Sequence, residues 1–140
     1  FSFSNIYLEN ENEAKLFNLN DGTFNQLDRR AQDRVKSHPQ AGVEILKEQK
    51  FFSEDLEKLI LNHHEQPDGS GFPRGLAASQ VSPLEALFIL SVNFANDIYG
   101  VTDKQHIKAT AEQYQELYSQ GNFKKVFQGF LLAFKYVTEL

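Results

Sequence analysis

The sequence predicts an all-α protein, a bundle of about five or six helices. Three observations lead to this fold class. Apolar residues recur at three- and four-residue spacings along most of the chain, which is the period of an amphipathic helix. Good helix N-caps stand at Ser53 and Ser82, each followed by acidic residues. No segment alternates between apolar and polar residues in the way that a half-buried strand does.

The composition fits one globular domain and excludes several classes of protein. The chain has 140 residues, of which 41% are hydrophobic and 13% aromatic, enough for a sizeable core. A net charge of −5 argues against a nucleic acid polymer as partner, because such a protein presents a basic face. The absence of cysteine excludes a disulfide framework and a thiolate metal site, and it is compatible with a cytoplasmic protein. No apolar run approaches the roughly 20 residues that span a bilayer, and no signal peptide is visible.

The first long helix is expected over about residues 28–50. Pro39 lies inside it and must kink the helix or begin a second one. The inward positions keep near-helical spacing: Leu27, Ala31, Arg34, Val35, His38, Ala41, Gly42, Ile45 and Leu46. Before this helix, residues 1–19 combine apolar stretches with a polar run at 9–13, and residues 20–22 are a turn signal.

The next helix is expected to begin after Ser53 and to end in two adjacent histidines. Its apolar stripe consists of Leu56, Leu59, Ile60 and His63. We therefore expect His63 to be buried and to hydrogen-bond to Asp68 or to a backbone carbonyl. His64 lies one step off the stripe and is expected to be the more exposed of the two. Residues 67–73 then form a glycine-rich loop with a proline at each end, which cannot extend the helix.

Three further helices complete the prediction. Ser82-Pro83-Leu84-Glu85 is a capping box with proline at the first helical position. It begins a markedly apolar helix that we expect to be buried nearly all round: Leu84, Leu87, Phe88, Leu90, Ser91 and Phe94. A helix over about 103–118 should turn inward Ile107, Ala111, Tyr114 and either Leu117 or Tyr118. The last, over about 123–137, has the stripe Val126, Phe127, Phe130, Leu131 and Phe134.

The loop after the second helix carries a family resemblance. Residues 63–76 read HHEQPDGSGFPRGL, which resembles the HHE-xx-DG-x-GYP-x-GL core of HD-GYP domains, with Phe72 in place of the tyrosine. Residues 38–46 resemble a second segment of the family, H-P-xx-G-xx-IL. Members of this family are bacterial all-α proteins that hydrolyse cyclic di-GMP at a cluster of two or three metal ions, usually iron or manganese. The resemblance therefore implies an HD-domain-like helical bundle.

The resemblance also implies roles for individual residues. His38, His63 and His64 stand at the positions of metal ligands, although His38 before a proline is, taken alone, a capping or core histidine. Nucleotide-binding positions fall on the glycine-rich loop and on one later lysine: Asp68, Gly69, Gly71, Phe72, Pro73 and Lys104. Phe72 keeps an aromatic plate for stacking on a guanine base but lacks the hydroxyl, and simple packing against the loop is an equal interpretation.

Several other family positions are not matched. The His-Asp doublet reads Glu9-Asn10, which also fits a solvated helix end or loop, and the lysine beyond it reads Glu13. The later ligating aspartate is replaced by Val92 or Asn93, depending on a one-residue gap. Asp97 comes four or five residues further on, where we expect the end of a helix or a turn. The basic segment that meets substrate phosphates reads Gly-Val-Thr-Asp-Lys at 100–104, and His106 is expected at the surface.

These departures favour a degenerate HD-GYP-type domain, kept as a sensor or interaction module in bacterial signalling. Whether the chain is an enzyme stays open at this point. The alternatives are an active metal-dependent phosphodiesterase that hydrolyses cyclic di-GMP with iron or manganese, and a receptor that binds cyclic di-GMP without cleaving it. A degenerate site needs no cofactor, whereas an active one requires the divalent metal.

The beginning of the chain leads to an expectation about partners. The sequence starts without methionine, so we expect residues 1–140 to be a single domain within a longer protein, lacking the upstream helices of a full family domain. Apolar residues near the start, Phe3, Ile6, Leu16 and Phe17, would then lie against another signalling domain or a second chain.

Overall fold

The described part of the chain folds into six helices and contains no strand. The computed structural model describes residues 22–49, 52–100 and 102–138, with side chains up to residue 133 in the last helix. The helices are α2 (Gly22–Gln26), α3 (Arg29–Leu46), α4 (Glu54–Asn62), α5 (Pro83–Asp97), α6 (Lys104–Leu117) and α7 (Gly121–Thr138). The all-α prediction is confirmed.

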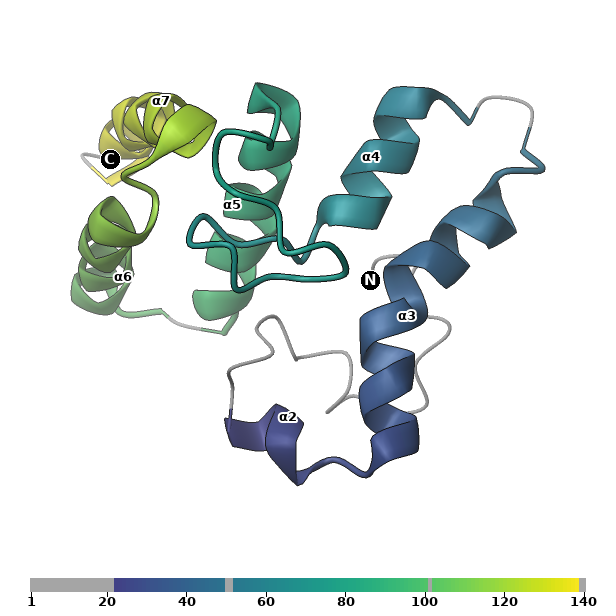
Figure 1. Cartoon of the computed structure of the whole chain (residues 1–140). Coiled ribbons are helices and arrows are strands. Elements are labelled where there is room, and N and C mark those ends of the chain that lie inside the picture. Colours follow the sequence, from purple (N-terminus) through teal and green to yellow (C-terminus); the bar gives the residue numbers. More distant parts are fainter. Residues whose placement is uncertain (1–21, 50–51, 101, 139–140) are drawn as a thin grey trace.

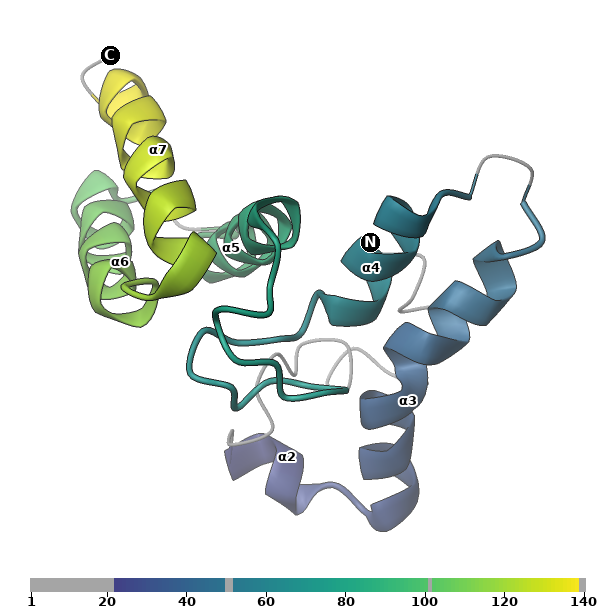
Figure 2. The same ribbon diagram turned by 45° about the horizontal axis from the view of Figure 1, so that its top comes forward.

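Helix α5 lies at the centre of the arrangement (Figure 1). It packs against α4 on one side and against α6 and α7 on the other, and α3 packs against α4. The second view shows the same order, with α6 and α7 crossing beside α5 and α3 at the opposite side (Figure 2). Residues 63–82 contain no helix, and this long connection runs from the end of α4 to the start of α5.

Local capping chemistry explains where three helices begin. The Asp28 carboxylate accepts from Ala31 N at 2.9 Å at the start of α3. Ser53 Oγ accepts from Leu56 N at 3.3 Å at the start of α4, as the sequence predicts. The capping box predicted at α5 is complete, because Ser82 Oγ accepts from the backbone N–H of Glu85 and the Glu85 carboxylate accepts from Ser82 N.

Pro39 does not divide α3 into two helices. One continuous helix includes it, and Figure 1 shows that the helix axis changes direction along its length. The buried side of α3 is formed by Ala31, Val35, His38, Pro39, Gly42 and Val43. The prediction that Ile45 faces inward is wrong, since its side chain is 53% exposed. The four-residue step from Val35 through Pro39 to Val43 leaves Ile45 about 200° round the helix from Val43.

The main core lies among α5, α6 and α7. We call this cluster the aromatic core, and its fully buried members are Leu76, Ala78, Val81, Ala86, Ile89, Leu90, Phe94, Ala111, Tyr114, Tyr118, Phe123 and Phe127. Tyr118 is the inward residue at the end of α6, and Leu117 is exposed, which decides between the two alternatives. The predicted residues Ile107, Val126, Phe130 and Leu131 pack against this cluster, and the side chain of Phe134 lies outside the described residues.

Helix α7 begins two residues earlier than predicted, at Gly121. This glycine has φ +53°, and a Cβ there would overlap the backbone of Ala78. Asn122 Nδ2 also donates to Val81 O at 2.9 Å. The start of α7 is therefore fixed to the connection that leads into α5, which ties the aromatic core to the segment after the histidines.

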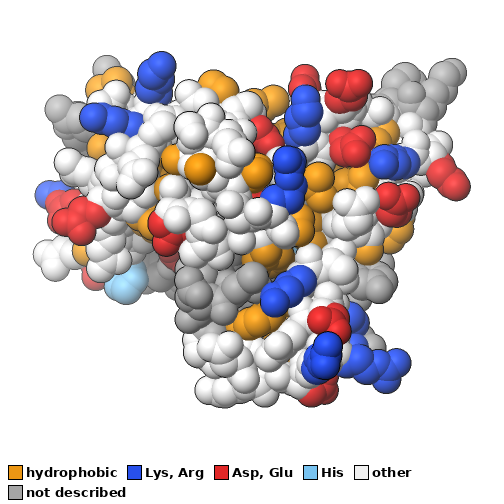
Figure 3. Space-filling model, viewed as in Figure 1, with side chains coloured by type: hydrophobic (Ala, Val, Ile, Leu, Met, Phe, Trp, Pro, Cys, Tyr) orange, Lys and Arg blue, Asp and Glu red, His pale blue; other side chains and the backbone are white. Residues whose placement is uncertain are grey.

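Helix α5 is not buried all round, so that prediction is wrong. Leu84, Leu87 and Phe88 are 50%, 47% and 36% exposed. Its buried side is Glu85, Ala86, Ile89, Leu90, Asn93 and Phe94, which face the neighbouring helices. Leu56 of α4 is exposed as well. Figure 3 shows hydrophobic side chains at the surface in the central part of this face of the molecule.

Among the described helices, none combines the length and hydropathy that a membrane span requires. The predicted positions Glu9, Asn10 and Glu13 lie outside the described residues, as do Phe3, Ile6, Leu16 and Phe17.

Candidate metal-binding site

Two helices bring the three candidate histidines together. His38 lies in α3 beside Pro39, and His63 is the C-cap of α4, with His64 directly after it. The end of α4 is held in place from α5, because Asn62 Nδ2 donates to the buried Glu85 carboxylate at 2.5 Å. Packing of α3 against α4 then places His38 opposite the pair.

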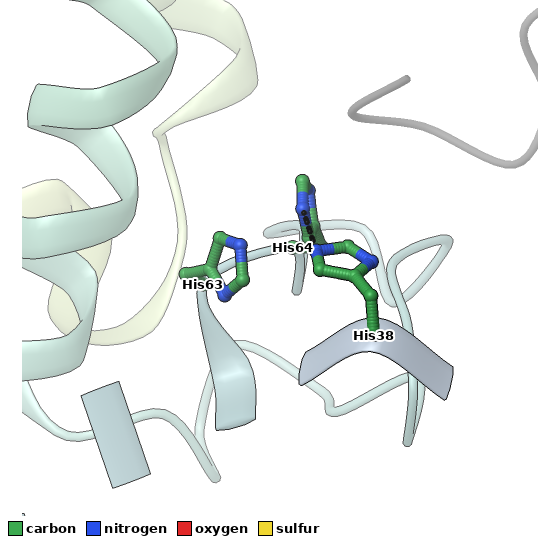
Figure 4. A group of neighbouring side chains, drawn as sticks. All are labelled: His38, His63 and His64. Atoms are coloured by element: carbon green, nitrogen blue, oxygen red, sulfur yellow. Dashed lines mark hydrogen bonds between the residues drawn. The ribbon is translucent and has the colours of Figure 1, made fainter. Parts of the chain in front are cut away.

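The three imidazoles form one compact buried group (Figure 4). His38, His63 and His64 are 1%, 5% and 3% exposed. One ring nitrogen from each lies within 4.8 Å of the others, and His38 Nε2 and His64 Nε2 are 3.0 Å apart. The ring centroids of His63 and His64 are 4.0 Å apart. The prediction that His38 and His63 share one site is confirmed.

Backbone carbonyls fix the protonation of two rings. His38 Nδ1 donates to Val35 O at 2.7 Å, and His63 Nδ1 donates to Ile60 O at 2.6 Å. A neutral imidazole has one N–H, so Nε2 of each ring carries a lone pair. His64 Nε2–H then donates to His38 Nε2. Metal-ligating histidines commonly donate their second nitrogen to a carbonyl in this way, so the arrangement suits ligands.

Burial keeps the cluster neutral. It lowers the pKa of His38 from 6.5 to about 4. The hydrogen bond to Val35 O raises this pKa somewhat, and the nearby His63 lowers it further. Burial also lowers the pKa of His63. The pKa of His64 falls well below 6.5 through burial and through the two neighbouring rings. Three neutral imidazoles are the form that binds a metal cation.

One expectation about these histidines is confirmed and another is wrong. His63 bonds to a backbone carbonyl, that of Ile60, which is one of the two acceptors expected. His64 is not the more exposed of the pair. Helical periodicity ends at Asn62, and beyond it the chain folds back so that Phe72 lies flat against the His64 ring, with centroids 4.5 Å apart and planes inclined by 13°.

The glycine-rich loop folds directly onto the histidine pair. Phe72 N donates to His64 O at 3.1 Å, and a Cβ at Gly71 would overlap the backbone of Glu65 and Gln66. Only glycine fits at that position. The peptide bond between Phe72 and Pro73 is cis.

The remaining predicted nucleotide-binding residues differ in their surroundings. Asp68 organises the loop, since its carboxylate accepts from Ser70 N and Ser70 Oγ at 3.0 and 2.6 Å, and these bonds lower its pKa. Gly69 takes φ +77° in the same turn. Pro73 is exposed, and Lys104 is an exposed residue at the start of α6. No described contact joins Lys104 to the histidines.

Glu65 is the residue whose place the sequence did not indicate. It is fully buried, and it accepts from Arg74 N at 2.8 Å and from Leu76 N at 2.6 Å. The signal available in the sequence was a carboxylate placed just before a loop whose backbone N–H groups need acceptors. The Asn62–Glu85 bond was likewise missed, and a contact across 23 residues leaves no local pattern.

Later acidic and amide candidates lie within other contacts. Asn93 is buried and donates to Tyr118 Oη at 2.8 Å, on the side of the aromatic core. Asp97 ends α5, as expected, and accepts from Tyr114 Oη at 2.5 Å. His106 is at the surface, as predicted. The described residues therefore bring no carboxylate into the histidine cluster.

The chemistry of the donor set decides which metal fits. Tetrahedral coordination by nitrogen at about 2.0–2.1 Å requires nitrogens about 3.3 Å apart. One pair here is 3.0 Å apart and all three nitrogens lie within 4.8 Å of one another, so the donor set suits one zinc-like ion after small movements of the rings. A bridged pair of hard ions such as manganese needs carboxylate oxygens, and the described donors do not supply them.

Known proteins have sequences similar to this chain. A family model described as HD domain matches residues 14–119, which is more than half of the chain. The cyclic di-GMP phosphodiesterase PA4108 of Pseudomonas aeruginosa is 42% identical over 50 residues, which are 36% of this chain and 12% of that protein. The cyclic di-GMP phosphodiesterase response regulator RpfG of Xanthomonas campestris pv. campestris is 41% identical over 56 residues, which are 39% of this chain and 15% of that protein.

The chain thus aligns with much less than two thirds of either relative. No solved structure matches. The resemblance seen in the loop and the histidines is confirmed at the level of the family model and these two phosphodiesterases. This chain belongs to the HD domain family.

Proposed function

We propose that this HD domain is a catalytically degenerate relative of the cyclic di-GMP phosphodiesterases and acts as a sensor or interaction module in bacterial signalling. The observation that carries the proposal is the donor set, three imidazoles with no carboxylate among the described residues. A bound divalent ion at such a site polarises a phosphate and activates a water molecule, and two-ion sites clamp both the attacking and the leaving oxygen. Three imidazoles alone support one ion at most.

Three acidic side chains considered as sources of the missing carboxylate support this proposal, because each has another role. Both oxygens of Glu65 accept loop N–H groups, and Asp68 is bonded to Ser70. Asp97 is bonded to Tyr114. Recruiting any of them as a ligand would break contacts that organise the loop or the end of α5.

The interaction part of the proposal is supported by the outer side of α5. Leu84, Leu87 and Phe88 leave apolar surface exposed there, and α5 contains no lysine or arginine. Exposed apolar surface of this kind favours contact with another protein surface. The proposed partners are another signalling domain or a second chain, and we retain the proposal that residues 1–140 form a single domain.

Two alternatives remain as proposals with their own supporting features. An active phosphodiesterase, with iron or manganese, would need carboxylates from residues outside the described part of the chain, such as Glu9. A receptor for cyclic di-GMP would use Phe72 and the loop around Asp68, with Lys104 as a phosphate contact. The identity of both relatives as cyclic di-GMP phosphodiesterases favours keeping this nucleotide as the ligand to test.

Metal analysis and turnover decide among these functions. Protein reconstituted with manganese or iron is assayed for cyclic di-GMP hydrolysis, and nucleotide binding is measured by calorimetry. We expect negligible hydrolysis. The control variant is His106→Ala, which removes an exposed histidine far along the chain from the cluster.

Each result has a definite meaning. Turnover that is lost in His63→Ala and kept in His106→Ala would show an active enzyme and overturn the proposal. Binding without turnover, weakened by Phe72→Ala, would instead establish the receptor. The absence of both nucleotide binding and turnover would support the sensor or interaction module.

A further inference from the structure

Glu65 is a buried carboxylate that the histidine cluster does not use. Its side chain is fully enclosed, and it does not belong to the group of side chains able to hold an ion. Oε1 accepts from Arg74 N at 2.8 Å and Oε2 accepts from Leu76 N at 2.6 Å. Both bonds are charge-assisted, which makes them stronger and shorter than neutral ones. A single side chain therefore closes the loop across nine and eleven residues.

The loop that Glu65 closes carries the ring that covers His64. Phe72 is held on one side by its own N–H, which donates to His64 O at 3.1 Å. On the other side, the two N–H groups that bond to Glu65 follow Phe72 by two and four residues. The Phe72 and His64 rings are stacked, with their centroids 4.5 Å apart. The Nε2 atom of His64 in turn lies 3.0 Å from the Nε2 atom of His38.

We infer that Glu65 is a positioning residue for the histidine cluster. Its carboxylate fixes the loop, the loop fixes Phe72, and Phe72 sets the plane of the His64 ring against His38. This role holds for a degenerate site and for a working one, so it goes beyond the proposed function. Glu65 orients a candidate ligand and is not itself a ligand.

The pairing requires a carboxylate and not merely a polar side chain. Two backbone donors converge on one group, and a carboxylate offers an acceptor to each. Glutamine has the same shape but presents an NH₂ group to one of the two donors. Glu65→Gln therefore breaks one bond while keeping the volume of the side chain, which makes it the most specific change available.

The first test follows the His64 ring by nuclear magnetic resonance in metal-free protein. Stacking on Phe72 shifts the ring-proton signals of His64 upfield. In Glu65→Gln we expect these signals to move toward those of the exposed His106, with unchanged helix content by circular dichroism. The matched control is Glu112→Gln, which removes the same charge from an exposed position on α6.

The second test uses cobalt(II) as a probe of the three nitrogens. We expect Glu65→Gln to weaken cobalt binding about 10-fold or more, the usual effect of removing a group that orients a ligand. Phe72→Leu should have a similar effect. The double variant should be little worse than either single one, because both changes act through the same ring.

Three outcomes would overturn the inference. His64 signals that stay in place in folded Glu65→Gln would show that Glu65 only stabilises the loop. Loss of cobalt binding with unmoved His64 signals would make Glu65 a ligand. Additive effects of Glu65→Gln and Phe72→Leu would mean that Glu65 does not act through Phe72.

A measurement on the unmodified chain keeps the inference testable if Glu65→Gln does not fold. The amide protons of Arg74 and Leu76 lie in a segment without helix or strand, yet the carboxylate should protect them from exchange as well as the amides of α4 are protected. Exchange at the rate of an open loop would contradict the closed arrangement.

Discussion

The histidine region and the aromatic core are equally well buried, but opposite kinds of side chain fill them. The histidine region, which we define as Asn62–Gln66 with His38 and Phe72, is composed largely of polar groups held by directional hydrogen bonds. The aromatic core is filled by rings that pack on one another, for example Tyr118 with Phe123 at 5.5 Å and with Phe127 at 6.2 Å between centroids.

This difference separates stability from geometry. A hydrogen bond formed on folding contributes a net stabilisation of about 0.5–1.5 kcal/mol, because the hydrogen bonds that the two groups made to water are lost in exchange. A buried aromatic side chain removes about 150–250 Å² from water and contributes much more. The aromatic core should therefore supply most of the free energy of folding. The histidine region should supply little of it, while its directional bonds fix the positions of ring nitrogens.

The largest expected effect comes from the aromatic core. Phe123 is fully buried at the start of α7, and Phe123→Ala should lower the free energy of unfolding by about 3–5 kcal/mol. Urea unfolding measures it. Phe88→Ala on the exposed side of α5 is the matched control and should cost far less. Equal losses of free energy in the two variants would mean that a partner surface covers the outer side of α5.

Acidification below pH 6.5 should lower the stability of the fold through the buried histidines. The unfolded chain takes up a proton on His38 near pH 6.5, whereas the folded chain does so only near its lowered pKa of about 4. Between these values the unfolded state binds more protons, so stability falls as pH falls. Above pH 6.5 the His38 ring is neutral in both states, so it adds no pH dependence to the free energy of unfolding. The loss for His38 approaches about 3 kcal/mol at pH 4.

Chemical unfolding of chelator-treated protein from pH 7.5 to 4 checks this prediction. The variant His38→Leu should show a shallower decline over the same range, while His106→Ala, altered at the surface, should follow the unmodified protein. A profile that is the same with and without His38 would show that the cluster is not the source of the decline.

Removing one polar contact tests how the end of α4 is held. Asn62 donates to Oε1 of the buried Glu85 carboxylate, and Asn62→Ala leaves that oxygen without its donor, while Oε2 keeps the bond from Ser82 N. Bonds to charged groups contribute about 1.5–3 kcal/mol, so we expect a loss of that size in thermal or urea unfolding. Asn96→Ala, on the exposed side of α5, is the control. A loss below that of the control would mean that water replaces the donor at Glu85.

The sequence predicted those features that depend on neighbouring residues. The caps at Ser53 and Ser82 were predictable because an N-cap and the N–H that it accepts are separated by only a few residues. The convergence of His38 on His63 was predictable only through the family resemblance, since a histidine before a proline is, taken alone, more often a capping or core residue.

Features that depend on distant contacts could not be predicted in this way. The apolar pattern of Leu84, Leu87 and Phe88 is the same whether or not another surface covers it, so composition overstated the burial of α5. The burial of His64 depends on Phe72 returning eight residues later, beyond the end of the helical period. The role of Glu65 depends on N–H groups nine and eleven residues away.

The smallest expected effect, and the one that bears most directly on function, concerns His63. His63→Ala removes the donor to Ile60 O and should cost about 1–3 kcal/mol, because a half-buried acceptor loses its partner. In a degenerate site this loss is the same with and without metal, and a chelator leaves the melting temperature of the unmodified protein unchanged. In a working metal site the ion binds only the native state and adds to its stability. Thermal scans with and without chelator separate the two cases, and a drop of several degrees on chelation would show that the three imidazoles hold a metal on which the fold depends.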